Sequence, residues 1–166
     1  LSALVGKKIY MQTMKDIFFS GTFGGETLSL AAAKAVLIKL KKDSVIKYLT
    51  ELGTYLHKEL DTLIEELDIS YFLAYSGHPS WSFLIFKDTK NATLWELKTF
   101  FMQEIFKCGV FTIGAQTLSY AHTQKDIDYL LKSYRKVFSM MKESIENNTI
   151  QNKLECEPLK PLFSVR

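Results

Sequence analysis

The residues best suited to chemistry lie in a short glycine-rich segment near the start of the chain. Residues 18–27 read Phe-Phe-Ser-Gly-Thr-Phe-Gly-Gly-Glu-Thr, and they lead directly into an alanine-rich run at 28–33. The three glycines permit turns with positive φ, so that backbone N–H groups can approach an oxyanion closely. A helix that begins near Thr27 would add the partial positive charge of its N-terminus. The pattern indicates a phosphate site in which the Thr22 hydroxyl donates a hydrogen bond, although a plain turn has the same composition.

The other side chains with catalytic potential are dispersed along the chain. His57 falls in an amphipathic helical pattern, where we expect it at the surface, and His78 falls in an exposed turn. His122 precedes a helix start, and we expect it to fix that helix entry. Cys108 and Cys156 lack the close spacing of metal ligands, which predicts free thiols and a cytoplasmic location. The sequence therefore predicts no metal site and no acid–base pair.

Hydrophobic periodicity predicts an α+β fold, with helices packed on a small antiparallel sheet. Two capping boxes, Thr93-x-x-Glu96 and Thr123-x-x-Asp126, mark helix starts. We expect helices over residues 7–14, 27–41, 45–67, 93–109 and 123–145. We expect strands over residues 69–75, 81–86, 110–113 and 117–120, the first two joined by a turn.

Composition excludes several classes of function. The 166 residues are 47% hydrophobic and 23% charged, with a net charge of +3. That charge is small, and the lysines are interleaved with glutamates, which argues against a nucleic-acid-binding stripe. The longest apolar stretch, 28–40, contains two lysines and is too short to span a membrane. The chain opens on an apolar, strand-like run at residues 1–6 rather than on methionine, so we expect it to be part of a longer protein.

Three segments together resemble the class III pyridoxal-phosphate-dependent aminotransferases, and most nearly the glutamate-1-semialdehyde aminomutase branch. Residues 1–8 look like the strand that follows the Schiff-base lysine of the family. Residues 19–25 look like its phosphate-binding loop, and residues 118–128 look like its late strand and last helix. The resemblance implies a fold type I enzyme. Residues 1–40 would then end the large cofactor-binding domain, with the phosphate-binding loop and an interdomain helix, and residues 41–166 would form the C-terminal small domain.

The resemblance also implies a site. The family delivers its loop threonine across a homodimer interface to the phosphate of pyridoxal 5'-phosphate in the neighbouring subunit. Thr22 matches this threonine, and Gly21 and Phe23 flank it. The Schiff-base lysine and the aspartate that pairs with the pyridine nitrogen would lie before Leu1, so no catalytic residue is expected in this chain and the chain alone is expected to be inactive.

One segment departs from the family pattern. Residues 112–117 contain no carboxylate where the aminomutases carry a glutamate, and no arginine to hold a substrate carboxylate. This favours an aminotransferase that moves an amino group from a small-molecule donor to an aldehyde or ketone, and the aminomutase reaction stays as the alternative. A non-catalytic interaction or regulatory module that keeps the small-domain fold is the alternative from another class.

Overall fold

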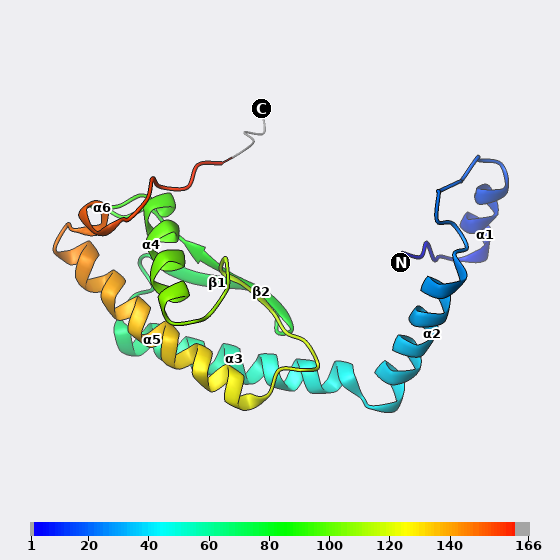
Figure 1. The fold of residues 1–166 in the computed structure, drawn as a ribbon, viewed down its shortest axis with the longest axis horizontal. Coiled ribbons are helices and arrows are strands. Elements are labelled where there is room, and N and C mark those ends of the chain that lie inside the picture. The colour runs from blue at the N-terminus through cyan, green and yellow to red at the C-terminus, as the bar shows by residue number, and fades with distance from the viewer. Residues whose placement is uncertain (1, 162–166) are drawn as a thin grey trace. The chain divides into compact units, whose positions relative to one another are not determined.

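The computed structural model describes residues 2–161 and divides the chain into two compact units, Leu1–Ile46 and Lys47–Arg166. The second unit combines helices with a three-stranded antiparallel sheet (Figure 1), which confirms the predicted α+β fold. The assignment of residues 1–40 and 41–166 to the large and small domains of related enzymes stays a prediction.

The first unit is helical. It contains a short helix α1 (Lys8–Met11), a 3₁₀ turn (Gln12–Lys15) and the sixteen-residue helix α2 (Thr27–Lys42). Residues 2–6 form no strand, so the predicted strand at the start of the chain is wrong over its described part. A strand needs a hydrogen-bonded neighbour, and this segment has none within the described residues.

Helix α2 has no buried residue, although it is rich in apolar side chains. The large apolar residues that remain exposed on it are Leu28, Leu30, Val36, Leu37 and Ile38. They are too widely distributed to lie on a single face, which is typical of a helix that is surrounded by protein. The aromatic residues before the helix are exposed as well, with Phe18 96% exposed and Phe23 80% exposed.

The sheet of the second unit has the order β1-β2-β3, with β1 at Leu73–His78, β2 at Trp81–Phe86 and β3 at Ala115–Thr117. The prediction for β2 is confirmed. The predicted first strand is displaced, because Gly77 at φ 127° lets β1 continue to His78 before the chain turns. The strands predicted at 110–113 and 117–120 are wrong. A single short strand, β3, follows the bend at Gly114, where φ is 90°, and overlaps the second predicted strand only at Thr117.

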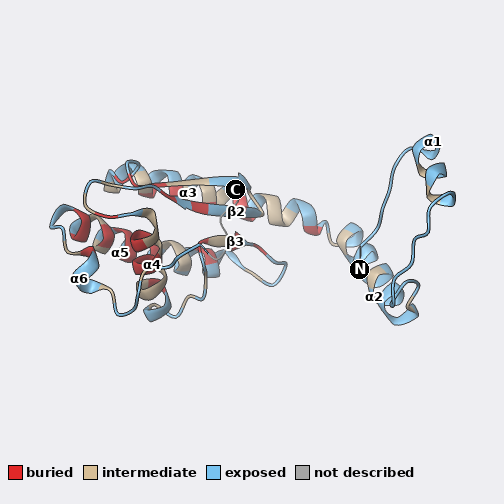
Figure 2. Ribbon diagram, turned by 90° about the horizontal axis from the view of Figure 1, so that it is seen from above, coloured by how far each residue is buried: buried red, intermediate tan, exposed pale blue. Residues whose placement is uncertain are grey.

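Helices α3 (Val45–Leu67), α4 (Leu94–Lys107), α5 (Gln124–Glu146) and the short α6 (Ile150–Lys153) complete this unit. Figure 2 shows its buried residues concentrated in these helices and in the sheet. Both predicted capping boxes are confirmed at the starts of α4 and α5. The core includes an aromatic group in which Tyr134 stacks on Phe138 with ring centroids 5.1 Å apart, and Phe138 stacks on Phe101 at 6.0 Å.

Helix α3 passes very close to the turn between β1 and β2. A Cβ atom placed on Gly53 would lie 2.1 Å from the carbonyl oxygen of Pro79. Only glycine leaves room for this approach, which fixes α3 against one end of the hairpin. The same approach lets the next turn of α3 reach the buried face of β2.

Candidate functional site

The predicted phosphate-binding segment forms a compact turn before α2. The Gly24 N–H donates to the Gly21 carbonyl at 2.9 Å, and the Glu26 N–H donates to the Phe23 carbonyl at 3.1 Å. Gly25 has φ 79°, a left-handed conformation that favours glycine. A Cβ on Gly24 would lie 3.1 Å from the Gly21 carbonyl oxygen, so this glycine also allows the turn to close tightly.

The turn keeps its remaining donors available. Gly21, Thr22 and Phe23 are all exposed, and nothing lies within 4 Å of a Cβ built on Gly21. Within residues 2–161 the backbone N–H groups of Thr22 and Phe23 and the Thr22 hydroxyl have no hydrogen-bond partner. Consecutive free N–H groups beside a hydroxyl are suitable donors for an anion such as phosphate. The three predicted binding residues are therefore exposed, and their contact with the phosphate of the cofactor stays a prediction.

The N-terminus of α2 is already occupied by a side chain that sequence reasoning missed. The Glu26 carboxylate accepts hydrogen bonds from the N–H groups of Leu28 at 2.8 Å and Ser29 at 2.6 Å. Hydrogen bonds from the Ser29 side chain, and then from these backbone groups, lower the pKa of Glu26. A phosphate at this turn would therefore accept hydrogen bonds from the N–H groups of the loop, because the Glu26 side chain already accepts from the first N–H groups of the helix.

A second polar arrangement lies inside the other unit and connects three elements. On α3, His57 Nε2 lies 2.9 Å from Ser82 Oγ on β2. The Ser82 hydroxyl donates to Gln116 Oε1 on β3, and Gln116 Nε2 donates to the Tyr134 hydroxyl on α5 at 3.4 Å. Ser82 and Tyr134 are fully buried, and Gln116 is 4% exposed. We refer to these four residues as the polar chain.

The polar chain corrects the expectation that His57 is a surface residue. The ring is half-buried and packs on Tyr75, with centroids 4.6 Å apart. Burial lowers the pKa of His57 below its ordinary value of 6.5, and Asp61 opposes this effect. In the same way, burial raises the pKa of Tyr134 to about 12. The helical periodicity placed His57 on α3 correctly, but the approach at Gly53 that buries it depends on tertiary structure.

The structure also places the two remaining histidines, His122 and His78. His122 does fix a helix entry, because its Nδ1 accepts from the Ser119 N–H at 3.0 Å and its carbonyl accepts from the Tyr48 hydroxyl at 2.7 Å. His78 is exposed beside the hairpin turn, where Nδ1 lies 2.9 Å from Ser80 Oγ. In the part of the chain that the structure describes, no three His, Cys, Asp or Glu side chains gather as metal ligands, and no helix is long and apolar enough to cross a membrane.

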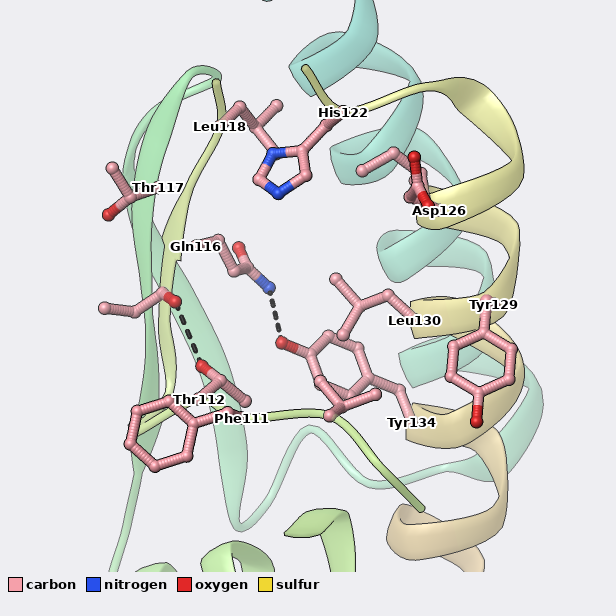
Figure 3. Close-up of a pocket in the computed structure, with 13 residues that line it drawn as sticks. Phe111, Thr112, Gln116, Thr117, Leu118, His122, Asp126, Tyr129, Leu130 and Tyr134 are labelled. Carbon is pink, nitrogen blue, oxygen red and sulfur yellow. Dashed lines mark hydrogen bonds between the residues drawn. The ribbon is translucent and has the colours of Figure 1, made fainter. Parts of the chain in front are cut away.

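A cavity of about 200 Å³ opens between β3 and α5, next to the polar chain. Figure 3 shows the Gln116 amide pointing across it toward the Tyr134 hydroxyl, with His122 and Leu130 on its walls. The cavity is lined mainly by apolar atoms, with a few polar groups. This composition is typical of small-molecule sites.

Comparison with known proteins reveals related enzymes, although no family model matches. The sequence is 24% identical over 148 residues to a 3-aminobutyryl-CoA aminotransferase of Cloacimonas acidaminovorans, covering 87% of this chain and 35% of the relative. It is 28% identical over 153 residues to a glutamate-1-semialdehyde 2,1-aminomutase of Desulfitobacterium hafniense, covering 85% and 36%. The chain therefore spans about a third of the length of these relatives.

The fold is similar to that of one solved PLP-containing protein. The FumI protein of Sphingopyxis sp. MTA144, in its PLP internal aldimine form, matches with a TM-score of 0.72 and 21% identity, over 86% of this chain and 34% of that one. The predicted resemblance is thus confirmed. In sequence the chain is similar to aminotransferases and, more particularly, to glutamate-1-semialdehyde aminomutases, and in fold it is similar to one part of a PLP-containing protein.

Proposed function

We propose that this chain is the C-terminal part of a PLP-dependent aminotransferase that acts on an aldehyde or ketone. The observation that carries the proposal is the exposed turn at Thr22, whose free N–H groups and hydroxyl fit a phosphate. It lies within a sequence related along most of its length to aminotransferases and aminomutases. When bound, pyridoxal phosphate would supply the electron sink for amino-group transfer.

In this proposal the chain anchors the cofactor and does not activate it. Thr22 donates its hydroxyl to the phosphate, while the N–H groups of Thr22 and Phe23 add two further hydrogen bonds. Glu26 holds the first turn of α2, so that the loop starts from a fixed helix end. Lys7 and Lys8 lie outside this turn, and we assign the Schiff-base lysine to another part of the protein.

The proposed site is shared between the two subunits of a homodimer. The support is the exposure of apolar residues in the turn and in the first turn of α2, including Phe23 and Leu28, at 80% and 79%. Apolar patches of this kind are typical of surfaces that bind protein. If this patch forms the subunit interface, the free N–H and hydroxyl donors of the turn would bind the phosphate at that interface.

The test is chemical labelling of the full-length protein encoded by the gene that contains this chain. The protein is incubated with pyridoxal phosphate, reduced with borohydride, digested and mapped by mass spectrometry. We expect one labelled lysine outside residues 1–166. Absence of a stable, saturable label would refute the enzyme proposal and favour a non-catalytic module, while a label on Lys7 or Lys8 would refute the assignment of catalysis to another part of the protein.

A further inference from the structure

Two tyrosine side chains lie on one face of α3, close to its start. Tyr48 and Tyr55 are seven residues apart, about two helical turns, and Leu52 lies between them. Both rings pack against a buried apolar cluster that includes Leu52, Leu118 and Ile127. Each ring is half-buried, so part of its surface remains within reach of a ligand.

Hydrogen bonds to α5 and to the segment before it hold both rings in place. The Tyr48 hydroxyl donates to the His122 carbonyl at 2.7 Å, and the Tyr55 hydroxyl donates to Asp128 Oδ1 at 2.8 Å. Tyr48 also makes an edge-to-face contact with Tyr120, with ring centroids 5.4 Å apart. The two rings therefore bridge α3 and α5 in fixed orientations, and neither hydroxyl hydrogen is left for a ligand.

A pocket of about 230 Å³ is lined by these two rings, and we refer to it as the tyrosine pocket. The other residues that line it are Glu51, Leu52 and Gln124. Because the hydroxyl hydrogens are already used, the tyrosines can offer a ligand the surfaces of their rings. The face of an aromatic ring carries partial negative charge, so it attracts a cation.

Acidic side chains add negative charge beside the tyrosine pocket. The hydrogen bond to Asp128, and then burial, raise the pKa of Tyr55, and the charges of Asp128 and Glu59 contribute to the rise. The Glu51 carboxylate lies on the pocket wall, 3.8 Å from Lys47 Nζ, and both side chains are largely exposed. Such a long, exposed ion pair contributes little, so Glu51 can exchange Lys47 for another cation.

We propose that the tyrosine pocket binds a quaternary ammonium group, with its methyl groups against the rings of Tyr48 and Tyr55 and its charge beside Glu51. A primary ammonium ion is strongly hydrated and carries three N–H donors, whereas a quaternary one has no donor to satisfy and suits aromatic walls. A cavity of about 150 Å³ binds benzene, so the tyrosine pocket has room for a trimethylammonium group. It lies wholly within the second unit, so the proposal does not rest on the phosphate site.

The experiment uses the full-length protein that contains this chain, with choline as the probe. The control ligand is 3,3-dimethylbutan-1-ol, which has the shape of choline but no charge. Binding is followed by NMR shifts of the Leu52 methyl groups. We expect saturable shifts with choline, and binding of the alcohol that is weaker by roughly threefold or more. Tyr48→Leu and Tyr55→Leu should each weaken choline binding roughly two- to fivefold, the value of one exposed cation–π contact, and change binding of the alcohol little.

Three further variants separate recognition of the cation from a change in structure. Glu51→Gln alters an exposed side chain, and it should weaken choline binding but not that of the alcohol. Tyr55→Phe keeps the ring without its hydrogen bond to Asp128, and it should retain most of the choline affinity. Tyr10→Leu removes a tyrosine that is 72% exposed in the first unit and should change nothing. Equal affinity for the two ligands, unchanged choline affinity in both pocket leucine variants, an equal loss in Tyr55→Phe and Tyr55→Leu, or no shift at Leu52 would overturn the proposal.

Discussion

Replacing Thr22 by alanine tests the proposed phosphate site most directly. The Thr22 hydroxyl has no partner within the described residues, so its removal breaks no internal hydrogen bond of the chain. The backbone N–H groups of the turn remain, and the loss is that of a single hydrogen bond to a charged group, about 1.5–3 kcal/mol. We expect the affinity of the full-length protein for pyridoxal phosphate to fall by roughly ten- to a hundredfold.

The assay is titration with pyridoxal phosphate, monitored by the absorbance of the bound cofactor. Ser20→Ala removes an exposed hydroxyl just outside the turn and should have little effect, while Thr22→Ser should restore most of the affinity. Pyridoxal lacks the phosphate, so its binding should not change in Thr22→Ala. An equal loss of affinity for pyridoxal and its phosphate would refute the assignment of Thr22 to the phosphate.

Mixed dimers test whether Thr22 acts across the interface. One subunit type carries Thr22→Ala, and the catalytic lysine is removed either from the same subunit or from its partner. With both changes on one subunit, the remaining lysine-bearing site has lost its threonine and should bind weakly. With the changes on separate subunits, that site keeps a threonine and should bind normally. Equal affinity in the two arrangements would exclude the shared site.

Glu26→Gln should leave the turn in place but speed amide hydrogen exchange in the first turn of α2, because a neutral cap interacts less with the helix dipole. The pKa of Glu26 is lowered on folding. The protection of these amides in the wild-type protein should therefore persist above pH 4.5 and be lost as pH falls through the lowered pKa. Unchanged exchange would contradict the cap. Gly53→Ala should destabilise the chain by about 1–3 kcal/mol or more in urea unfolding, because its Cβ collides with the Pro79 carbonyl; an unaffected midpoint would show that α3 can shift away. The pKa of His57 is lowered on folding, so the unfolded chain binds more protons, and the free energy of unfolding should fall as pH drops below about 6.5. His57→Gln should flatten the dependence of the free energy of unfolding on pH in this range. If that dependence is unaltered, the titrating group is a residue other than His57. Light scattering of the isolated chain should show self-association that rises with concentration, because the apolar side chains of α2 are exposed; a monodisperse monomer at high concentration would contradict this.

Local signals in the sequence were sufficient where the structure itself depends on local interactions. The Thr93 and Thr123 capping boxes, the amphipathic pattern of α3 and α5 and the aromatic, β-favouring composition of β2 all correspond to observed elements. Each follows from side chains a few residues apart. The glycine-rich turn was predictable for the same reason, whereas the role of its three proposed binding residues stays a prediction.

The errors have tertiary causes. The β-rich run at 110–120 contains apolar residues suited to a strand, but only Ala115–Thr117 pairs with β2. Residues 2–5 have no neighbouring strand among the residues that the structure describes. The polar chain joins residues separated by 18 to 34 positions at its hydrogen bonds, and no short motif links them. Glu26 was missed as a cap because a glutamate is a less common residue than serine or aspartate at this position.

The outward-facing turn at Thr22 has a thermodynamic consequence if its ligand is held by two subunits. Binding of the ligand and association of the subunits are then linked, and each must strengthen the other by the same factor. Dilution would lower occupancy of the cofactor, and a saturating cofactor would lower the concentration at which dimers form. The affinity of each active site for the cofactor would then depend on whether the partner subunit is bound.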